Sequence, residues 1–290
     1  MYAPEFDYYR ASSLADAHQL LAAHPGAKLL AGGHSLLPLL KLRLAAPPSL
    51  VDIGRVAELT GIERQGDIIR IGALTTHADL AGSTELRSAA PGLAEAAAMI
   101  GDPTVRNRGT IGGNVAHADP ASDLPAVLVA LGARVVVSGA GGERTIAADQ
   151  FFTGIMTTAL KDDEILVRIE VPASGRGQGS AYAKFSHPAS RYAVVGAAAL
   201  VAVKDGTCSE ARVAVGGLLP CARRLPAVER ALAGKSAGDD AIAAAASQAA
   251  SDLGNDVTGD IFASAHYRTA MAPVYIKRAL ATAVARASAL

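Results

Sequence analysis

In two segments of the chain, apolar residues precede a glycine pair and a polar residue follows it. The first is Leu29-Leu30-Ala31-Gly32-Gly33-His34-Ser35-Leu36, and the second is Thr110-Ile111-Gly112-Gly113-Asn114. Glycine adopts positive φ at little cost and lets a ligand approach the backbone closely. Successive unblocked N–H groups then form a concavity that binds anions. Two such segments could hold the two phosphates of a dinucleotide.

The spacing of these glycines differs from that of the common phosphate-binding motifs. Neither segment contains G-x-x-x-x-G-K-[ST], which disfavours a P-loop NTPase, and the first expected strand is not followed by G-x-G-x-x-G, which disfavours a standard Rossmann site. A tight turn is the alternative interpretation of either pair taken alone. Two pairs with similar flanks favour a shared ligand, although the pattern does not identify that ligand.

The residues around the first pair predict a strand followed by a helix. Residues 27–31 form a short apolar run suited to a buried strand, and Ser35 can cap a helix through about Leu42. Leu14 begins an earlier helix with apolar residues at helical spacing, and residues 49–53 suit a second strand. In the first segment, a helix start would add its free N–H groups and its dipole to the anion site.

Strands and helices continue up to Pro172, where a strand is expected to stop. A hairpin is predicted at 62–64 and 68–71, a strand pair at 133–137 and 145–146, a strand at 164–171, and helices at 76–80, 91–100 and 123–131.

The pattern changes after residues 173–180, the one stretch with the composition of a linker. Three strands in succession are predicted at 181–185, 193–203 and 211–216, with Asp205-Gly206 as a hairpin turn, and then helices at 226–233, 240–253 and 267–287. Strands followed by helices favour an α+β second domain with a three-stranded antiparallel sheet.

Length and composition limit the class of protein. The chain has 290 residues, of which 50% are hydrophobic, so two domains with a sizeable core are expected. Lys+Arg and Asp+Glu both number 27, and this neutral balance argues against a nucleic-acid-binding protein. The two cysteines, Cys208 and Cys221, are too few for an iron–sulfur cluster or a disulfide scaffold.

Targeting signals are not evident. No run approaches the roughly 18 apolar residues of a transmembrane helix. Residues 1–7 lack the basic and apolar regions of a signal peptide. A soluble protein in the cytoplasm is expected, with the inner face of the membrane as an alternative place of work.

Both glycine segments lie within longer motifs that occur in the same order in one known family. The first extends over 31–38 and is followed by Lys41 and Arg43, and the second extends over 108–114 and continues to Asp123-Leu124-Pro125. Phe6-Asp7-Tyr8, the strand at 163–166 and Tyr182–Phe185 also fit. Over nearly its whole length the chain resembles the FAD-binding medium subunit of the molybdenum hydroxylases, the family of xanthine oxidase and aerobic carbon monoxide dehydrogenase.

The resemblance implies an α+β fold with a FAD-binding domain of the vanillyl-alcohol-oxidase type and a C-terminal domain of the carbon monoxide dehydrogenase flavoprotein type. The first domain would cover 1–175, with subdomains at about 1–55 and 56–175, and the second 176–290. The implied contacts with non-covalent FAD are Leu30, Ala31, Gly32, Gly33, His34, Ser35, Leu36, Ile100, Thr110, Ile111, Gly112, Gly113, Asn114, Asp123, Leu166, Lys184 and Tyr192.

The resemblance also implies roles for some of these residues. The pyrophosphate would lie on the two glycine segments, and Asp123 would accept a hydrogen bond from a flavin or ribose hydroxyl. Leu166 and Lys184 would lie near the isoalloxazine, Ile100 would pack on the cofactor, and Tyr192 would lie beside the flavin ring. Arg191 receives no role, because many members of the family differ there.

Three of these positions have an alternative interpretation. His34 could attach flavin covalently, although the resemblance is to non-covalent members. His117 and Asp119 could bind a metal with Asp123, although the flavin motif explains them better, so no metal site is expected. Lys184 could equally be a solvated strand lysine instead of a cation that stabilises anionic reduced flavin.

The function that the resemblance implies is electron transfer. The chain would take electrons from iron–sulfur clusters of a small subunit and pass them to an external acceptor, while a large subunit with a molybdenum cofactor oxidises the substrate. A dimer of such heterotrimers is expected, and no general acid or base is assigned to this chain. The substrate and the acceptor stay undetermined.

Two other functions stay open. A self-sufficient flavin oxidase or reductase would need a substrate pocket with a base and charged anchors, which the sequence does not identify. An assembly subunit that has lost flavin is disfavoured, because both glycine pairs and Asn114 are intact.

Overall fold

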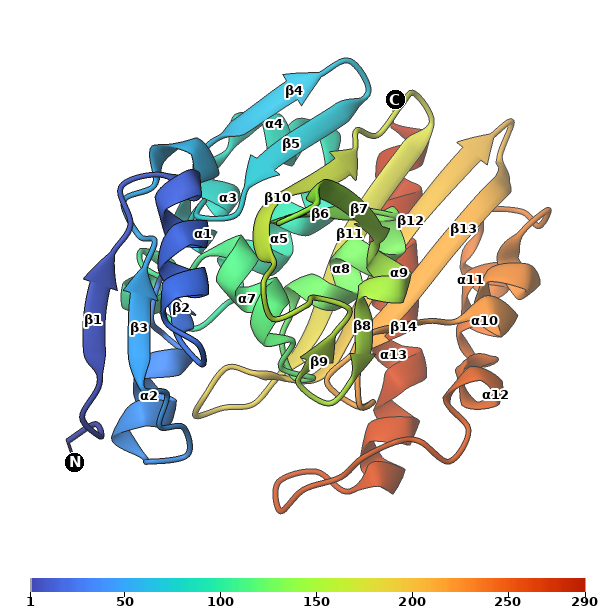
Figure 1. The fold of residues 1–290 in the computed structure, drawn as a ribbon. Helices are drawn as coiled ribbons and strands as arrows, with labels where there is room; N and C mark the ends of the chain where they lie inside the picture. The colour runs from blue at the N-terminus through green and yellow to red at the C-terminus, as the bar shows by residue number, and fades with distance from the viewer. Residues whose placement is uncertain (1, 290) are drawn as a thin grey trace.

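The structure, a computed structural model, describes residues 2–289, so the outermost residues of the two expected domains, Met1 and Leu290, lie outside it. Three main sheets follow one another along the chain (Figure 1). The first is parallel, with order β1-β3-β2, and contains β1 (Asp7–Arg10), β2 (Lys28–Leu30) and β3 (Ser49–Asp52). Helices α1 (Leu14–Ala23) and α2 (Leu36–Lys41) connect its strands, as parallel pairing requires.

The second sheet is antiparallel, with order β4-β5-β10-β6-β7. Its strands are β4 (Ile62–Gln65), β5 (Ile68–Gly72), β6 (Arg134–Gly139), β7 (Gly142–Ala147) and β10 (Ile165–Pro172). The other elements of this part are the 3₁₀ helix Ala57–Leu59, α3 (His77–Gly82), α4 (Thr84–Ala89), α5 (Pro91–Ala98), α6 (Pro103–Arg106), α7 (Ile111–His117), α8 (Leu124–Leu131), α9 (Ala148–Phe151), β8 (Phe152–Gly154) and β9 (Thr157–Thr158).

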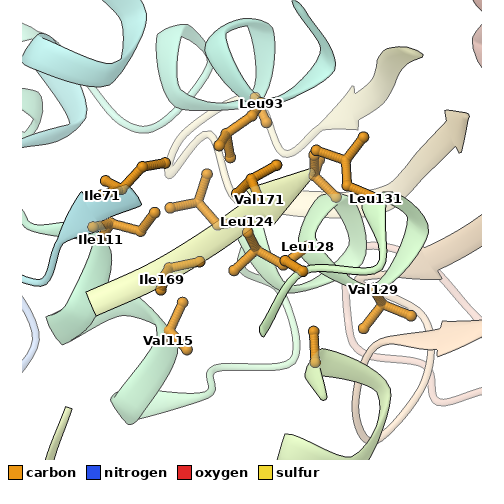
Figure 2. Close-up of a cluster of buried hydrophobic side chains, with 14 of the residues drawn as sticks. Ile71, Leu93, Ile111, Val115, Leu124, Leu128, Val129, Leu131, Ile169 and Val171 are labelled. Carbon is orange, nitrogen blue, oxygen red and sulfur yellow. The ribbon is translucent and has the colours of Figure 1, made fainter. Parts of the chain in front are cut away.

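The core of this part joins the sheet to its helices (Figure 2). Ile169 and Val171 of β10 lie in one buried cluster with Leu93 of α5, Ile111 of α7 and Leu124 of α8. Strand β10 lies between β5 and β6 in the sheet, so most of its side chains are buried, that of the charged Glu170 among them.

The third sheet is antiparallel, with order β11-β12-β13-β14. It contains β11 (Gln178–Ser186), β12 (Ala193–Lys204), β13 (Thr207–Gly216) and β14 (Arg223–Arg224), and α10 (Pro226–Leu232), α11 (Asp239–Ala246), α12 (Ala249–Leu253) and α13 (Ala265–Ser288) follow. Helix α13 packs on β11 and β12, while α8 also packs on β12 and β13. Every residue of α8 is therefore buried, as its uniformly apolar sequence predicts.

The structure differs from the predicted elements at several places. The third sheet has a fourth strand, β14, which is only two residues long and too short for a periodicity signal. The helix predicted over 240–253 is two helices, α11 and α12, and the Ser247 hydroxyl donates to the Ala244 carbonyl where α11 ends. Strand β1 was not predicted, because three of its four residues are exposed and it carries no alternating pattern.

The segment predicted as a linker is attached to the first part of the chain. The Ala173 N–H donates to the Asp67 carbonyl, and the Ser174 N–H donates to the Ala89 carbonyl. A separate tie comes from the Arg286 guanidinium of α13, which pairs with Glu95 of α5. Among residues 2–289, no helix has both the length and the apolar character that crossing a bilayer requires.

Candidate functional site

The two glycine segments lie directly against each other. A Cβ atom on Gly32 would overlap the Arg108 carbonyl oxygen and would lie 2.9 Å from the Gly109 Cα atom. Two backbones can approach this closely only where one residue lacks a side chain, so this position admits only glycine. This contact brings together residues 30–36 and 110–114, here named the glycine group.

The first segment presents its backbone without internal hydrogen bonds. Gly33 has φ +78°, a left-handed conformation that favours glycine, and its carbonyl accepts from the Leu37 N–H as α2 begins. The N–H groups from Gly32 to Ser35 donate to no other group within residues 2–289. Ser35 stands at the N-cap position of α2 as predicted, but its side chain makes no capping bond. Its hydroxyl and these N–H groups are available to an anion.

The second glycine pair lies in a helix that was not predicted from the sequence. Gly112 and Gly113 occupy the first turn of α7, and the Thr110 hydroxyl caps this helix by accepting from the Gly113 N–H at 3.2 Å. The helix was missed because two adjacent glycines disfavour helical structure. Here the tertiary packing of Ile111 and Val115 in the core overrides that preference.

The two glycines of the second pair have different surroundings. A Cβ atom on Gly112 would lie 2.7 Å from the Ala73 carbonyl oxygen, so this glycine lets α7 pack on the neighbouring backbone. A Cβ atom on Gly113 would meet only the Thr110 hydroxyl at 2.9 Å and the Ala31 Cβ at 3.9 Å within the described chain. Gly113 thus faces the first segment, and Gly112 faces away from it.

A buried side-chain network lies at the other end of α7. The Tyr182 hydroxyl donates to Asp123 Oδ1 at 2.6 Å, and Lys184 Nζ donates to Asp123 Oδ2 at 2.8 Å. Lys184 Nζ also donates to the Met99 carbonyl at 3.2 Å, next to Ile100. The Asp123 residue is 3% exposed and the Lys184 side chain 1%, so the interpretation of Lys184 as a solvated strand lysine is wrong.

The ionisation of Asp123 reflects opposing effects. Burial raises the pKa of Asp123 above its ordinary value, while the Lys184 ammonium and then the Tyr182 hydroxyl oppose that rise. Burial, and then the Asp123 charge, raises the pKa of Tyr182 well above 10, so this hydroxyl stays a donor. Asp123 was expected to accept from a flavin or ribose hydroxyl, but both of its oxygens accept from protein groups.

The remaining predicted residues lie around this network. Leu166 is buried on β10, paired with Val137 of β6, and Ile100 is half-buried beside the core. Tyr192 precedes β12 and is 44% exposed, and desolvation and the charges of Asp119 and Asp123 raise its pKa. We name Ile100, Asp123, Leu166, Tyr182, Lys184 and Tyr192 the Asp123 group.

Hydrogen bonds connect the glycine group to the Asp123 group. The Ser122 hydroxyl donates to Asn114 Oδ1 at 2.7 Å, which joins the glycine group to the residue beside Asp123. His117 and Asp119 lie between them, and residues 2–289 contain no cluster of three or more His, Cys, Asp or Glu side chains that could hold a metal ion. Arg191 has φ +60° and donates to the Gly101 carbonyl at 3.4 Å, beside Ile100.

Sequence analysis missed two buried polar residues at this site. Tyr182 lies two residues before Lys184 on a strand, a spacing that places both on one face and could have suggested a shared partner. His77 begins α3, and its N–H donates to the Gly109 carbonyl at 3.0 Å. Its side chain is buried with Nδ1 lacking a partner among the described residues, and no sequence signal marked it.

The pKa of His77 is lowered to about 4, by burial first and then by the charges of His34 and Arg106. His34 of the glycine group is therefore close to His77, which is neutral at neutral pH. A cleft of about 830 Å³ adjoins the glycine group, and Ala31, Gly32, Thr76, Arg108 and Thr110 are among its lining residues. Asp123, Leu166, Lys184 and Tyr192 do not line this cleft.

Comparison with known proteins covers nearly the whole chain. A family model described as FAD binding domain in molybdopterin dehydrogenase matches residues 4–174, and one described as CO dehydrogenase flavoprotein C-terminal domain matches residues 180–283. The carbon monoxide dehydrogenase medium chain of Hydrogenophaga pseudoflava is 43% identical over 289 residues, which are 99% of each chain. The nicotine 6-hydroxylase medium subunit of Paenarthrobacter nicotinovorans is 36% identical, over 98% of this chain and 99% of the other.

Solved structures extend this similarity to the fold. Carbon monoxide dehydrogenase from Hydrogenophaga pseudoflava superposes with a TM-score of 0.94 at 44% identity, over 99% of each chain. Quinoline 2-oxidoreductase from Pseudomonas putida 86 superposes with a TM-score of 0.92 at 33% identity, also over 99% of each chain. Both parts of the chain are therefore represented in these structures, in the same order.

Proposed function

Because this chain belongs to the family of FAD-binding medium subunits of molybdenum hydroxylases, we propose that the glycine group holds the FAD pyrophosphate and that the Asp123 group lies at the isoalloxazine. The chain is the FAD-binding, electron-transferring subunit of an oxidoreductase complex. The iron–sulfur clusters and the molybdenum cofactor belong to other subunits of the complex. Bound FAD supplies a carrier that can take up one or two electrons, and the protein supplies its position and electrostatic surroundings.

The direct contact of Gly32 with the Arg108–Gly109 backbone is the observation that carries this proposal. It brings together segments that are far apart in sequence and aligns the N–H groups of 32–35 with the Gly113 face of α7. A diphosphate needs several hydrogen-bond donors, and the N–H groups of residues 32–35 can supply them. The residues present therefore fit the cofactor.

In the Asp123 group, the apolar side chains and the charged side chain would have different roles toward the flavin ring. Leu166 and Ile100 would pack against the ring system and exclude water. The Lys184 ammonium would lie beside it as a fixed positive charge, since Asp123 and the Met99 carbonyl hold it in place. None of these residues has to exchange a proton with a substrate, and we assign no catalytic acid or base to this chain.

We further propose that the chain is organised as FAD-binding subdomains at about 1–55 and 56–175 and a C-terminal domain from residue 176. The ranges of the two family models, 4–174 and 180–283, support this boundary. The separate sheets support the subdivision, since β1–β3 lie within 1–55 and β4–β7 and β10 within 56–175.

The assembly that we propose is a dimer of heterotrimers that works in the cytoplasm, with the inner face of the membrane as an alternative location. Relatives named as medium chains or medium subunits support the heterotrimer. Both cysteines are free thiols, which is consistent with a reducing compartment. The mass of the purified complex tests the dimer: twice the mass of one heterotrimer is expected, and a single heterotrimer mass would contradict it.

The substrate of the complex would be chosen in the large subunit and not in this chain. The named substrates of relatives support this view, because carbon monoxide, nicotine, glyceraldehyde and caffeine share no chemistry that one conserved medium subunit could recognise. We therefore propose that this chain does not contact the substrate of its complex.

The experiment that tests the function is a cofactor inventory of the complex, co-expressed with its small and large subunits. We expect flavin in this chain and iron and molybdenum in the partners. The double variant Gly33→Val plus Gly113→Val should lose FAD, because Gly33 is at positive φ with the Leu37 side chain beside it, and because a side chain on Gly113 would face the first segment. Gly141→Val is the control, since a Cβ atom there meets nothing within 4 Å among the described residues. FAD retained by the double variant, or a purified chain that oxidises a substrate without partners, would contradict the proposal.

A further inference from the structure

Tyr182 belongs to the buried network around Asp123, but the proposed function gives it no role. Strand β11 places Tyr182 and Lys184 on the same side of the third sheet, because alternate residues of a strand share a face. Both side chains reach Asp123 just before α8, Tyr182 through Oδ1 and Lys184 through Oδ2. The carboxylate is thus held from two sides by one strand.

The neighbouring strand makes room for this arrangement. Gly196 of β12 pairs in register with Lys184, and the Tyr182 side chain crosses over it. A Cβ atom on Gly196 would overlap the Tyr182 hydroxyl and would lie 3.2 Å from its Cζ atom. A larger residue on β12 would displace the hydroxyl from Asp123. The position of the Tyr182 hydroxyl therefore depends on a specific glycine in an otherwise apolar strand.

A carboxylate this deeply buried needs hydrogen-bond donors in order to stay ionised, because burial favours its neutral form. Lys184 supplies one donor and the Tyr182 hydroxyl the other, and this hydroxyl does not ionise in the neutral range. If Asp123 took up a proton, the Lys184 ammonium would lose its counter-charge in a site from which water is excluded. The ammonium would then carry an unbalanced positive charge.

We propose that Tyr182 is a positioning residue, whose hydroxyl keeps Asp123 ionised so that the ammonium of Lys184 stays paired and charge-balanced at the isoalloxazine end of the flavin site. The statement about the flavin rests on the proposed function. The statement about Asp123 concerns the chain alone and can be measured without FAD.

Other charged and titratable groups face this network. Tyr192 lies on the segment before β12, and Asp119 on the loop before α8. Glu95 of α5 accepts from the Tyr182 N–H and pairs with Arg286 of α13. None of these groups donates a hydrogen bond to Asp123 in the described chain, so Tyr182 and Lys184 control its ionisation.

The first experiment is an infrared titration of the flavin-free full-length chain, in which the band of a protonated carboxyl is assigned by its loss in Asp123→Asn. We expect Tyr182→Phe to raise the apparent pKa of Asp123 by at least about 1 unit, a tenfold change in its ionisation constant. Gly196→Ala should shift the titration in the same direction, because it displaces the hydroxyl and keeps the tyrosine.

Tyr275→Phe is the matched control, since it removes the hydroxyl of another buried tyrosine, which stacks on Phe185 outside the network. It should leave the Asp123 titration unchanged. Equal titrations of the parent chain and Tyr182→Phe would overturn the proposal. So would a shift of the same size in Tyr275→Phe, because the effect would then be a general consequence of a perturbed core.

The second experiment measures the midpoint potential of bound FAD in the complex as a function of pH. In Tyr182→Phe, protonation of Asp123 would leave the Lys184 charge unbalanced, and a cation beside the ring favours reduced, anionic flavin. The potential of the variant should therefore rise above that of the parent as the pH falls through the new pKa, and the two should agree at higher pH. Tenfold stronger binding of reduced FAD corresponds to about 30 mV for a two-electron couple.

The two experiments fail in different ways. A chain that shows the infrared shift but binds no FAD would contradict the proposed function and leave the role of Tyr182 toward Asp123 intact. Bound FAD without the infrared shift would contradict the role of Tyr182 and leave the proposed function intact. Both results without the pH-dependent potential would show that the network does not act on the flavin.

Discussion

The glycine group consists of backbone and open surface, whereas the Asp123 group consists of side chains in the interior. In the glycine group, Gly32 and Gly112 pack on neighbouring backbone, and the N–H groups of 32–35 stay available. In the Asp123 group, one carboxylate is bonded to a hydroxyl and an ammonium out of contact with water. A side chain added to the glycine group should therefore disrupt it, whereas the Asp123 group should be disrupted when one of its side chains is removed.

The largest effect is expected where a side chain is added to the glycine group. Gly32→Val would force the Arg108–Gly109 backbone away. We expect a loss of stability of about 2–3 kcal/mol, as in an overpacked core, and FAD binding weakened by at least ~100-fold. Urea unfolding and a fluorescence titration with FAD measure the two effects. Gly141→Val, in open space, should change neither, and FAD binding of parental strength in Gly32→Val would show that the close contact is dispensable.

The largest loss of stability, as distinct from loss of FAD affinity, is expected where a partner is removed from the Asp123 group. Lys184→Met leaves a buried carboxylate without its counter-charge, a type of change that costs about 3–5 kcal/mol. The raised pKa of Asp123 would rise further, above its value in the unfolded chain, so the folded state would bind the extra proton. The destabilisation should be complete at neutral pH and should diminish as the pH falls.

Unfolding of Lys184→Met at several pH values tests this prediction. The double variant Lys184→Met plus Asp123→Asn serves as the control, because it has no buried charge and should be more stable at pH 7 than Lys184→Met. Destabilisation of Lys184→Met that does not change with pH would mean that packing, and not charge, accounts for the loss.

The glycine group should show the opposite response to acid, through His77. The folded pKa of His77 is about 4 and its ordinary value is 6.5, so the unfolded chain binds the proton first as the pH falls. Neutral, buried His77 therefore contributes to stability above pH 6.5. This contribution, on the order of 3 kcal/mol, should be lost between about pH 6.5 and 4. His77→Gln should remove this part of the acid sensitivity.

Guanidinium unfolding from pH 7 to 4.5 measures this difference, and His18→Gln is the matched control because His18 bonds Ser138 away from the site. An acid response that is identical in the parent and in His77→Gln would contradict the assignment. The same response in His18→Gln and His77→Gln would indicate a general effect of histidine loss.

The smallest effect is expected at the hydrogen bond that joins the two groups. Ser122→Ala removes the donor to Asn114 Oδ1 and should cost about 1 kcal/mol, the usual net value of such a bond. Ser247→Ala removes a hydroxyl bond at an exposed helix end and should cost less. A double-mutant cycle of Ser122→Ala with Gly113→Ala measures the coupling between the two groups. Strict additivity would show that they act independently.

Much of the fold could be predicted from local pattern. The local patterns at 27–31, 49–53 and 164–171 indicated β2, β3 and β10, and Asp205-Gly206 indicated the turn between β12 and β13. Helix α8 was predicted because all of its residues are apolar or compatible with a buried helix. Short elements such as β14 and α6 were not, because two to four residues carry no periodicity.

The residues of the glycine group could also be recognised in the sequence, but their arrangement in space could not. A residue without a side chain is a chemical type, so Gly32, Gly33, Gly112 and Gly113 could be recognised in the chain itself. That the second pair belongs to a helix could not, since local propensity opposes it and only the core contacts of Ile111 and Val115 favour it. The pairing of each glycine with a particular backbone also depends on chain segments distant in sequence.

By itself the sequence determined which backbone could approach an anion, which runs would be buried, and which family the chain resembles. Only the tertiary structure decided that Lys184 is buried and paired, that both Asp123 oxygens accept from protein donors, and that the side chains of Tyr182 and His77 are buried. The physical reason is the separation along the chain over which each effect acts. Conformational preference and apolar periodicity act between residues a few positions apart, whereas desolvation and ion pairing depend on atoms that the folded chain brings together from distant segments.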